Sequence, residues 1–181
     1  MSRSVMLSIK PKWCELIESG QKTIEIRKTR PKIKPPFKCY IYQTKAPVSV
    51  SFSGTGKHIS EYDKTYWYTG KQGKVIGEFV CDEILEDKGG EYANEFSVLG
   101  CMPLEQQKKY APKATLYGWH ISDLVIYDQP ENLDDFQKDC GYAYCLEDCK
   151  RPINSRWACA FSVAAGLKRP PQSWCYVKER A

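Results

Sequence analysis

Short apolar runs and polar bends alternate along the first part of the chain and predict a strand followed by a helix. Residues 5–9 form a short β-rich run. Trp13, Leu16 and Ile17 then fall at positions i, i+3 and i+4, which predicts one buried helical face. Gly20 tolerates the left-handed conformation and is predicted to end the helix.

A second strand is predicted directly after this bend. Polar and apolar side chains alternate over residues 23–27, so one face of the strand is apolar and the other carries Thr23, Glu25 and Arg27. Lys22 lies at the bend itself. Because these charges gather beside a helix end, we expect them to hold a small polar ligand.

The remaining pattern predicts an α+β fold. Further strands are predicted at residues 38–43, 74–85, 114–127 and 172–178, and short helices at 103–110 and 130–136. Such a set indicates a small, mixed and mostly antiparallel β-barrel with two or three short helices. Residues 1–181 are predicted to form a single domain, with a polar insertion at 44–73 and a cysteine-rich insertion at 138–167.

Positive charge is concentrated near the amino end of the chain. The formal net charge is +5. This bias favours a polyanionic or phosphate-bearing partner, although a solubilising surface explains the same charge. The basic residues of this region include Lys10, Lys12, Lys22, Arg27, Lys28, Arg30, Lys32, Lys34 and Lys38.

The chain carries no sequence signal for a membrane or for secretion. No apolar run approaches the roughly 20 residues that span a bilayer, and no secretory h-region or cleavage site is found. We therefore expect a cytoplasmic protein. Its nine cysteines are then not expected to form a disulfide framework, and their odd number argues the same way.

Four cysteines cluster in the second insertion and are candidate zinc ligands: Cys140, Cys145, Cys149 and Cys159. Four thiolates close in sequence can complete a tetrahedral zinc site, and a segment without a core of its own gains stability from one. Their spacing is irregular, so the same residues also fit scattered reduced cysteines. Structural zinc is the one cofactor that the sequence suggests.

The first part of the chain contains Ser-Ile-Lys-Pro at residues 8–11 and Ser-Gly-Gln-Lys-Thr-Ile-Glu-Ile-Arg at residues 19–27. These motifs resemble the ASCH family, whose fold is a small β-barrel like that of PUA RNA-binding domains. Residues 117–124 and 168–177 look like the closing strands of phage and bacterial members. The resemblance covers about two-thirds of the chain and implies a PUA-like barrel.

The same resemblance implies one candidate reaction. Within the family, acetylcytidine amidohydrolases use a lysine, a threonine three residues later and a distant glutamate. Lys22 matches that lysine, but Glu25 stands where the threonine belongs. Glu78 is the candidate partner carboxylate, because a carboxylate buried in an apolar strand must be paired or shift its pKa.

The candidate catalytic residues are therefore Lys22, Glu25 and Glu78. However, attraction to Glu25 favours a protonated Lys22, which works against a lysine base. A purely structural ion pair between Lys22 and Glu25 explains the same residues.

Tryptophans accompany the basic residues and suggest a place for a base. Trp13 and Trp119 are predicted to fill the core, whereas Trp174 is a candidate stacking surface. Arg27 could clamp a phosphate bidentately, as a lysine cannot. The candidate ligand-binding residues are Lys10, Lys22, Thr23, Glu25, Arg27, Arg30, Gln172, Ser173 and Trp174.

The favoured function is binding of RNA, of a nucleotide or of a modified base. One alternative is amide hydrolysis of an acylated cytidine-like nucleoside. A second alternative is a phage accessory module in which the barrel binds another protein.

Overall fold

The structure is a computed structural model that describes residues 3–45, 50–53, 56–59, 70–112, 115–139 and 166–180. The chain divides into two compact units, each assembled from separate stretches. The first unit combines Met1–Pro11, Tyr40–Gly77 and Tyr127–Ala181, and the second combines Lys12–Cys39 and Glu78–Ile126.

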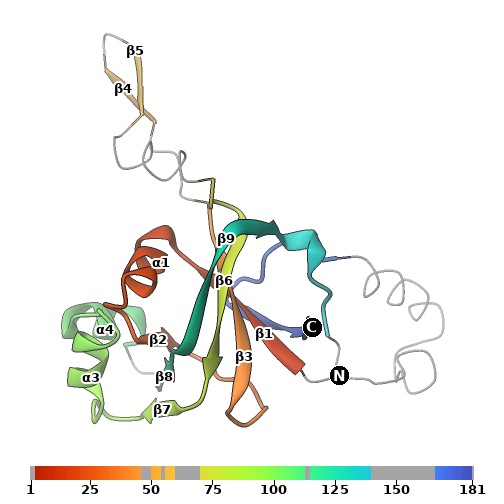
Figure 1. The fold of residues 1–181 in the computed structure, drawn as a ribbon. Coiled ribbons are helices and arrows are strands. Elements are labelled where there is room, and N and C mark those ends of the chain that lie inside the picture. Colours follow the sequence, from red (N-terminus) through yellow and green to blue (C-terminus); the bar gives the residue numbers. More distant parts are fainter. Residues whose placement is uncertain are drawn as a thin grey trace, which may run out of the picture. The chain divides into compact units, whose positions relative to one another are not determined.

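The described elements are strands and short helices (Figure 1). The strands are β1 (Arg3–Ile9), β2 (Ile24–Arg27), β3 (Phe37–Gln43), β4 (Val50–Ser53), β5 (Gly56–Ile59), β6 (Lys74–Cys81), β7 (Ile84–Asp87), β8 (Leu116–His120), β9 (Ser122–Asn132) and β10 (Trp174–Lys178). The helices are α1 (Pro11–Glu18), α3 (Ala93–Val98), α4 (Leu104–Tyr110) and the 3-10 turn η1 (Leu133–Asp135).

The described strands form three sheets. A five-stranded sheet has the order β10-β1-β3-β6-β9, a three-stranded sheet has the order β2-β8-β7, and β4 pairs with β5. The pairs β1–β10, β2–β8, β4–β5 and β7–β8 are antiparallel. The α+β class and the antiparallel content are confirmed, whereas these strands do not close into the predicted barrel.

The core of the second unit forms where β2 and β8 meet the helices. Ile24 and Ile26 pack with Phe96 of α3 and with Met102. Gly118 of β8 lies opposite Ile26, and a Cβ atom there would be 2.5 Å from the Phe96 ring. The sheet can therefore approach α3 closely only because this position lacks a side chain.

The first unit is organised by the pairing of β1 with β10. Met6 packs with Tyr40, Phe136 and Val177 in one buried cluster. The Ser8 hydroxyl donates to the Pro171 carbonyl oxygen at 2.7 Å, which fixes the approach to the last strand.

Two long predicted strands are each divided in the structure. Residues 74–85 give β6 and β7, and residues 114–127 give β8 and the start of β9. In both cases the chain passes from one sheet to another at the break. Asp123 has a positive φ of 46° just after the second break, a backbone change that a periodic pattern does not reveal.

Two further sequence predictions concern the insertions. The predicted excursion at 44–73 contains β4 and β5. The four candidate zinc ligands, Cys140, Cys145, Cys149 and Cys159, lie outside the described residues. None of the helices that the structure describes has the length and apolarity needed to cross a membrane.

Candidate functional site

The end of α1 places Lys22 at the centre of a buried polar network. Gly20 adopts φ +72°, the left-handed conformation predicted for it, and its N–H donates to the Ile17 carbonyl. The Lys22 N–H then donates to the Leu16 carbonyl at 2.8 Å. These two bonds turn the chain from the helix into β2 and fix the start of the Lys22 side chain.

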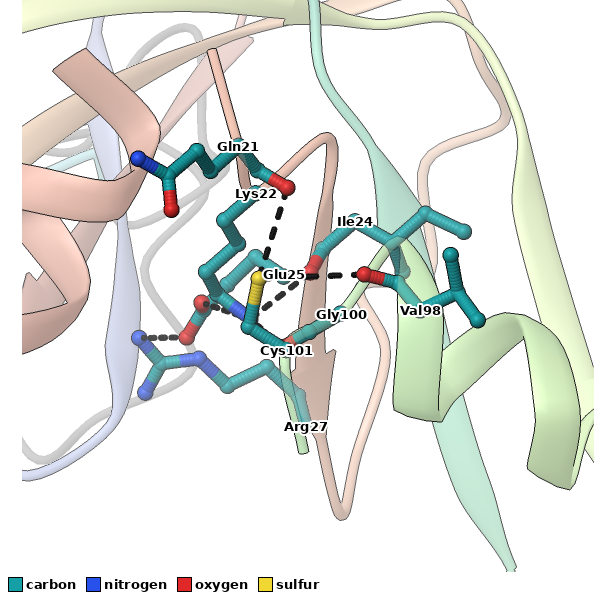
Figure 2. A network of polar contacts seen from close by, with 8 residues as sticks. All are labelled: Gln21, Lys22, Ile24, Glu25, Arg27, Val98, Gly100 and Cys101. Carbon is teal, nitrogen blue, oxygen red and sulfur yellow. Dashed lines mark hydrogen bonds and ion pairs between the residues drawn. The ribbon is translucent and has the colours of Figure 1, made fainter. Parts of the chain in front are cut away.

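The Lys22 ammonium is enclosed by acceptors (Figure 2). Its Nζ donates to the carbonyl oxygens of Ile24 at 2.8 Å and Gly100 at 2.6 Å. It also lies 3.4 Å from Glu25 Oε2 and 5.1 Å from the centre of the Trp13 ring. The side chain is only 1% exposed. The three N–H donors of the ammonium group thus face three acceptors, which makes Lys22 a hydrogen-bond donor in this network.

Glu25 is shared between two cations. Its Oε2 faces Lys22, and its Oε1 lies 3.0 Å from Nη2 of Arg27 (Figure 2). The Glu25 and Arg27 side chains are 7% and 8% exposed. One carboxylate between two cations leaves a net positive charge in a site of low dielectric, where such interactions are strong.

The loop after α3 closes this network from a distant part of the sequence. Cys101 has a positive φ of 51°, and its Sγ lies 3.3 Å from the Gln21 carbonyl oxygen. A Cβ atom on Gly100 would be 2.6 Å from the Phe96 carbonyl oxygen, so no larger residue fits there without movement. Sequence reasoning did not identify this loop, because its contribution to the site is a main-chain carbonyl.

Directly after the buried network, the chain presents a run of exposed cations. We call Lys28, Arg30, Lys32 and Lys34 the basic segment; all four side chains are exposed. Lys28 Nζ lies 4.5 Å from the centre of the Tyr110 ring. The Arg30 guanidinium lies 5.9 Å from the Tyr117 ring and 3.9 Å from Glu86. Cations over aromatic rings form a surface that suits phosphates and stacked bases.

Tyr110 connects the basic segment electrostatically with the buried network. Burial raises the pKa of its phenol above the ordinary value. The positive charge of Arg27 opposes that shift, and the negative charge of Glu25 adds to it. Tyr110 therefore stays protonated near neutral pH and is available as a hydrogen-bond donor.

Comparison with known proteins identifies the family to which this arrangement belongs. A family model described as the ASCH domain matches residues 7–136. The chain belongs to the ASCH family. This ASCH domain therefore has a PUA-like fold. No curated protein sequence matches the chain.

Solved structures of the ASCH protein from Zymomonas mobilis resemble this ASCH chain. A serine-to-alanine mutant is 16% identical with a TM-score of 0.59, and the match covers 97% of this chain and 89% of that one. The protein itself is 18% identical with a TM-score of 0.58, covering 97% and 88%. A tyrosine-to-phenylalanine mutant is 16% identical with a TM-score of 0.53, covering 97% and 91%. At these identities the likeness shows the fold alone.

Glu78 differs from its sequence-based prediction. It was expected to be a buried partner of Lys22, but its side chain is 23% exposed and lies 2.9 Å from Lys38 Nζ. A carboxylate on β6 that reaches solvent needs no buried partner, so the reason for grouping it with Lys22 does not hold.

The other predicted ligand residues are distributed over both units. Thr23 is half-buried and its N–H donates to the Leu99 carbonyl at 2.9 Å. Arg30 belongs to the basic segment. The remaining candidates belong to the first unit, where Lys10 and Gln172 are exposed and Ser173 and Trp174 are half-buried.

The tryptophans follow the prediction in part. Trp119 is fully buried, and its ring meets Phe37 edge-on at 5.8 Å, as expected of a core residue. Trp13 is only half-buried, and the centre of its ring lies 4.9 Å from Lys12 Nζ and 5.1 Å from Lys22 Nζ. Trp174 meets Tyr176 edge-on at 5.4 Å.

A second polar pair lies at the turn between β6 and β7. His120 Nδ1 lies 2.6 Å from Asp82 Oδ1, and both side chains reach solvent. This hydrogen bond is the main reason why the pKa of Asp82 is lowered. Among the described residues, no group of three or more His, Cys, Asp or Glu side chains is arranged to hold a metal ion.

Proposed function

We propose that this ASCH protein binds single-stranded RNA through the basic segment and the tyrosines beside it. The observation that carries the proposal is the position of this segment. Four exposed cations follow at every second residue after a strand whose last member, Arg27, is anchored by Glu25. Four exposed cations within seven residues of one loop can contact several phosphates of one nucleic-acid backbone.

Within this proposal, the buried network positions the RNA surface and does not touch RNA itself. Lys22 donates to main-chain oxygens on both sides of the site. Glu25 then holds Arg27 at the end of β2. A segment that leaves a fixed strand end loses less conformational freedom on binding, which favours affinity.

The aromatic rings give the proposed surface a way to contact bases. Tyr110 and Tyr117 lie beneath Lys28 and Arg30. Bases stack on such rings at about 1–3 kcal/mol each without strong sequence preference. The ASCH fold supports the assignment because it belongs to the PUA-like class.

Salt-dependent binding of a labelled RNA oligomer of about 12 nucleotides tests the proposal. Fluorescence anisotropy between about 50 and 200 mM salt should give an affinity that falls steeply as salt rises. The double variant Lys32→Ala/Lys34→Ala should bind more weakly and reduce the slope of log K against log salt by about 1.4, which is the expected value for two lost phosphate contacts.

The matched control is Lys12→Ala/Lys109→Ala, which removes the same charge from two exposed positions outside the basic segment. It should leave the slope within experimental error of the unaltered protein. Equal effects of the two double variants would show only general charge attraction, and no binding at low salt would remove the RNA assignment.

The amidohydrolase alternative requires Lys22 to accept a proton. In this structure, however, Lys22 donates to the carbonyl oxygens of Ile24 and Gly100 and faces the Glu25 carboxylate. We therefore expect no acetate release from acetylcytidine, and measurable turnover that Lys22→Met abolishes would favour the enzyme instead.

A further inference from the structure

A separate pocket in the second unit lies between the end of β7, the helices α3 and α4, and the start of β8. Its volume is about 410 Å³, which is in the range of small-molecule sites. No residue of this pocket belongs to the buried network or to the basic segment. The lining residues that matter here are Asp87, Lys88, Gly89, Leu104, Lys108 and Leu116.

A mostly buried carboxylate lines this pocket. Asp87 is 6% exposed and lies opposite Leu116 in the β7–β8 pairing. Its Oδ1 accepts the N–H of Gly90 at 2.6 Å and that of Gly89 at 3.2 Å. The Asp87 carboxylate lies on the pocket lining, where a ligand hydroxyl or amine can donate a hydrogen bond to it.

Two lysines supply positive charge at the rim of the pocket. The Lys88 side chain is 74% exposed and lies 3.2 Å from Glu86. The Lys108 side chain is 63% exposed and lies 3.3 Å from Glu105. Exposed pairs of this kind are weak, so either ammonium group can turn to an incoming anion at little cost.

An apolar wall completes the lining. Leu104 is 46% exposed and lines the pocket together with Ala111 and Leu116. A flat ring packed on this wall would bury the exposed face of Leu104. Gly89 adds free space, because a Cβ atom built there meets no atom within 4 Å.

We propose that this pocket binds a nucleoside monophosphate. A ribose hydroxyl donates to Asp87, the phosphate contacts Lys88 and Lys108, and the base packs on Leu104. Acidic side chains bind ribose hydroxyls in the same way in dinucleotide-binding folds. The nucleotide is either free or the terminal nucleotide of an RNA chain. This inference does not depend on RNA binding by the basic segment.

Isothermal titration calorimetry with the four ribonucleoside 5′-monophosphates, using the full chain, tests the pocket. At least one of them should bind. Asp87→Asn should weaken binding about tenfold, because it replaces the acceptor oxygen by a donor amide. Lys108→Ala should weaken it up to about fivefold. The matched control Lys109→Ala, an exposed lysine on the same helix that is not part of the lining, should bind as the unaltered protein does.

Further measurements distinguish a free nucleotide from the end of an RNA chain and define the results that would overturn the proposal. The 2′-deoxy form of the best ligand should bind more weakly if Asp87 accepts the 2′-hydroxyl. A 5′-phosphorylated RNA oligomer that depends on Lys108 while free nucleotides do not bind would assign the pocket to the RNA end. Binding that neither Asp87→Asn nor Lys108→Ala changes, or no binding of any ribose phosphate, overturns the proposal. Lys108→Ala alters only an exposed side chain, so misfolding of Asp87→Asn would not hide the answer.

Discussion

Replacing Lys22 by methionine should destabilise the protein strongly. Methionine keeps most of the aliphatic volume beside Trp13 but removes the ammonium group. The carbonyl oxygens of Ile24 and Gly100 then lose this donor, and Glu25 loses one of its two cations while it keeps the ion pair with Arg27. Each buried group left unsatisfied costs about 1–3 kcal/mol, and breaking a buried ion pair costs about 3–5 kcal/mol.

We therefore expect Lys22→Met to lower the free energy of unfolding by about 4 kcal/mol, because the ion pair and the two carbonyl bonds overlap and do not add fully. For a chain of this length, such a loss lowers the melting temperature by about 10 °C. Thermal unfolding followed by circular dichroism measures it. The control is Lys12→Met, which removes an exposed lysine that also contacts the Trp13 ring and should change stability by less than about 0.5 kcal/mol.

The sign of the effect also separates two interpretations of the network. Catalytic groups are commonly held at a cost in stability, so removing a poised base would leave the protein unchanged or more stable. A loss below about 1 kcal/mol, or any gain, would refute the structural role assigned here to Lys22. A thermodynamic cycle with Glu25→Gln should then show the two positions coupled, with the double variant less destabilised than the sum of the single ones.

Three further predictions follow from the described contacts. His120→Asn should raise the pKa of Asp82 toward its ordinary value, since the His120 hydrogen bond is the main cause of the lowering. Because the folded pKa of Asp82 is lowered, this pair stabilises the fold above about pH 4, and the stabilisation is lost as the pH falls through the folded pKa. NMR titration of the Asp82 carboxyl carbon measures this pKa. Cys39 and Cys81 should resist alkylation at about pH 8 until the protein unfolds. The reason is that burial raises the pKa of both thiols, that of Cys81 to about 12. Mass spectrometry measures the labelling, and labelling at the rate of a free thiol would contradict this prediction. Gly118→Ala should cost about 1–3 kcal/mol of stability because its methyl group meets Phe96 and Ile24, whereas Gly89→Ala, which meets nothing within 4 Å, should melt close to the unaltered protein.

The local features of the fold could be predicted where the signal lies within a few residues. The predicted helix is present as α1 and is closed by Gly20, and the final strand lies inside the predicted range. Helix α4 was predicted from its own sequence, whereas α3 was not. Helix α3 has six residues, and its main anchor is the fully buried Phe96, a tertiary contact that no local period reports.

The candidate site could be predicted only in its charged members. The alternation over residues 23–27 suggested one buried and one exposed face, but all four residues of β2 are buried. The polar face is covered because Glu25 neutralises part of the charge of Lys22 and Arg27 and makes their burial tolerable. The Gly100 acceptor could not be predicted, because every residue has a main-chain carbonyl oxygen and the residue type does not indicate which one will accept a hydrogen bond.

The bond from Lys22 to the Gly100 carbonyl joins positions 78 residues apart in the chain. During synthesis, the lysine therefore emerges well before its acceptor exists. Until that later loop has been synthesised, Lys22 lacks this acceptor, and Lys22, Glu25 and Arg27 can remain hydrated. The charges of Lys22, Glu25 and Arg27 are therefore buried only after the contact between Lys22 and the Gly100 loop has formed. The solvent accessibility of Glu25 thus reports how far a nascent or truncated chain has folded.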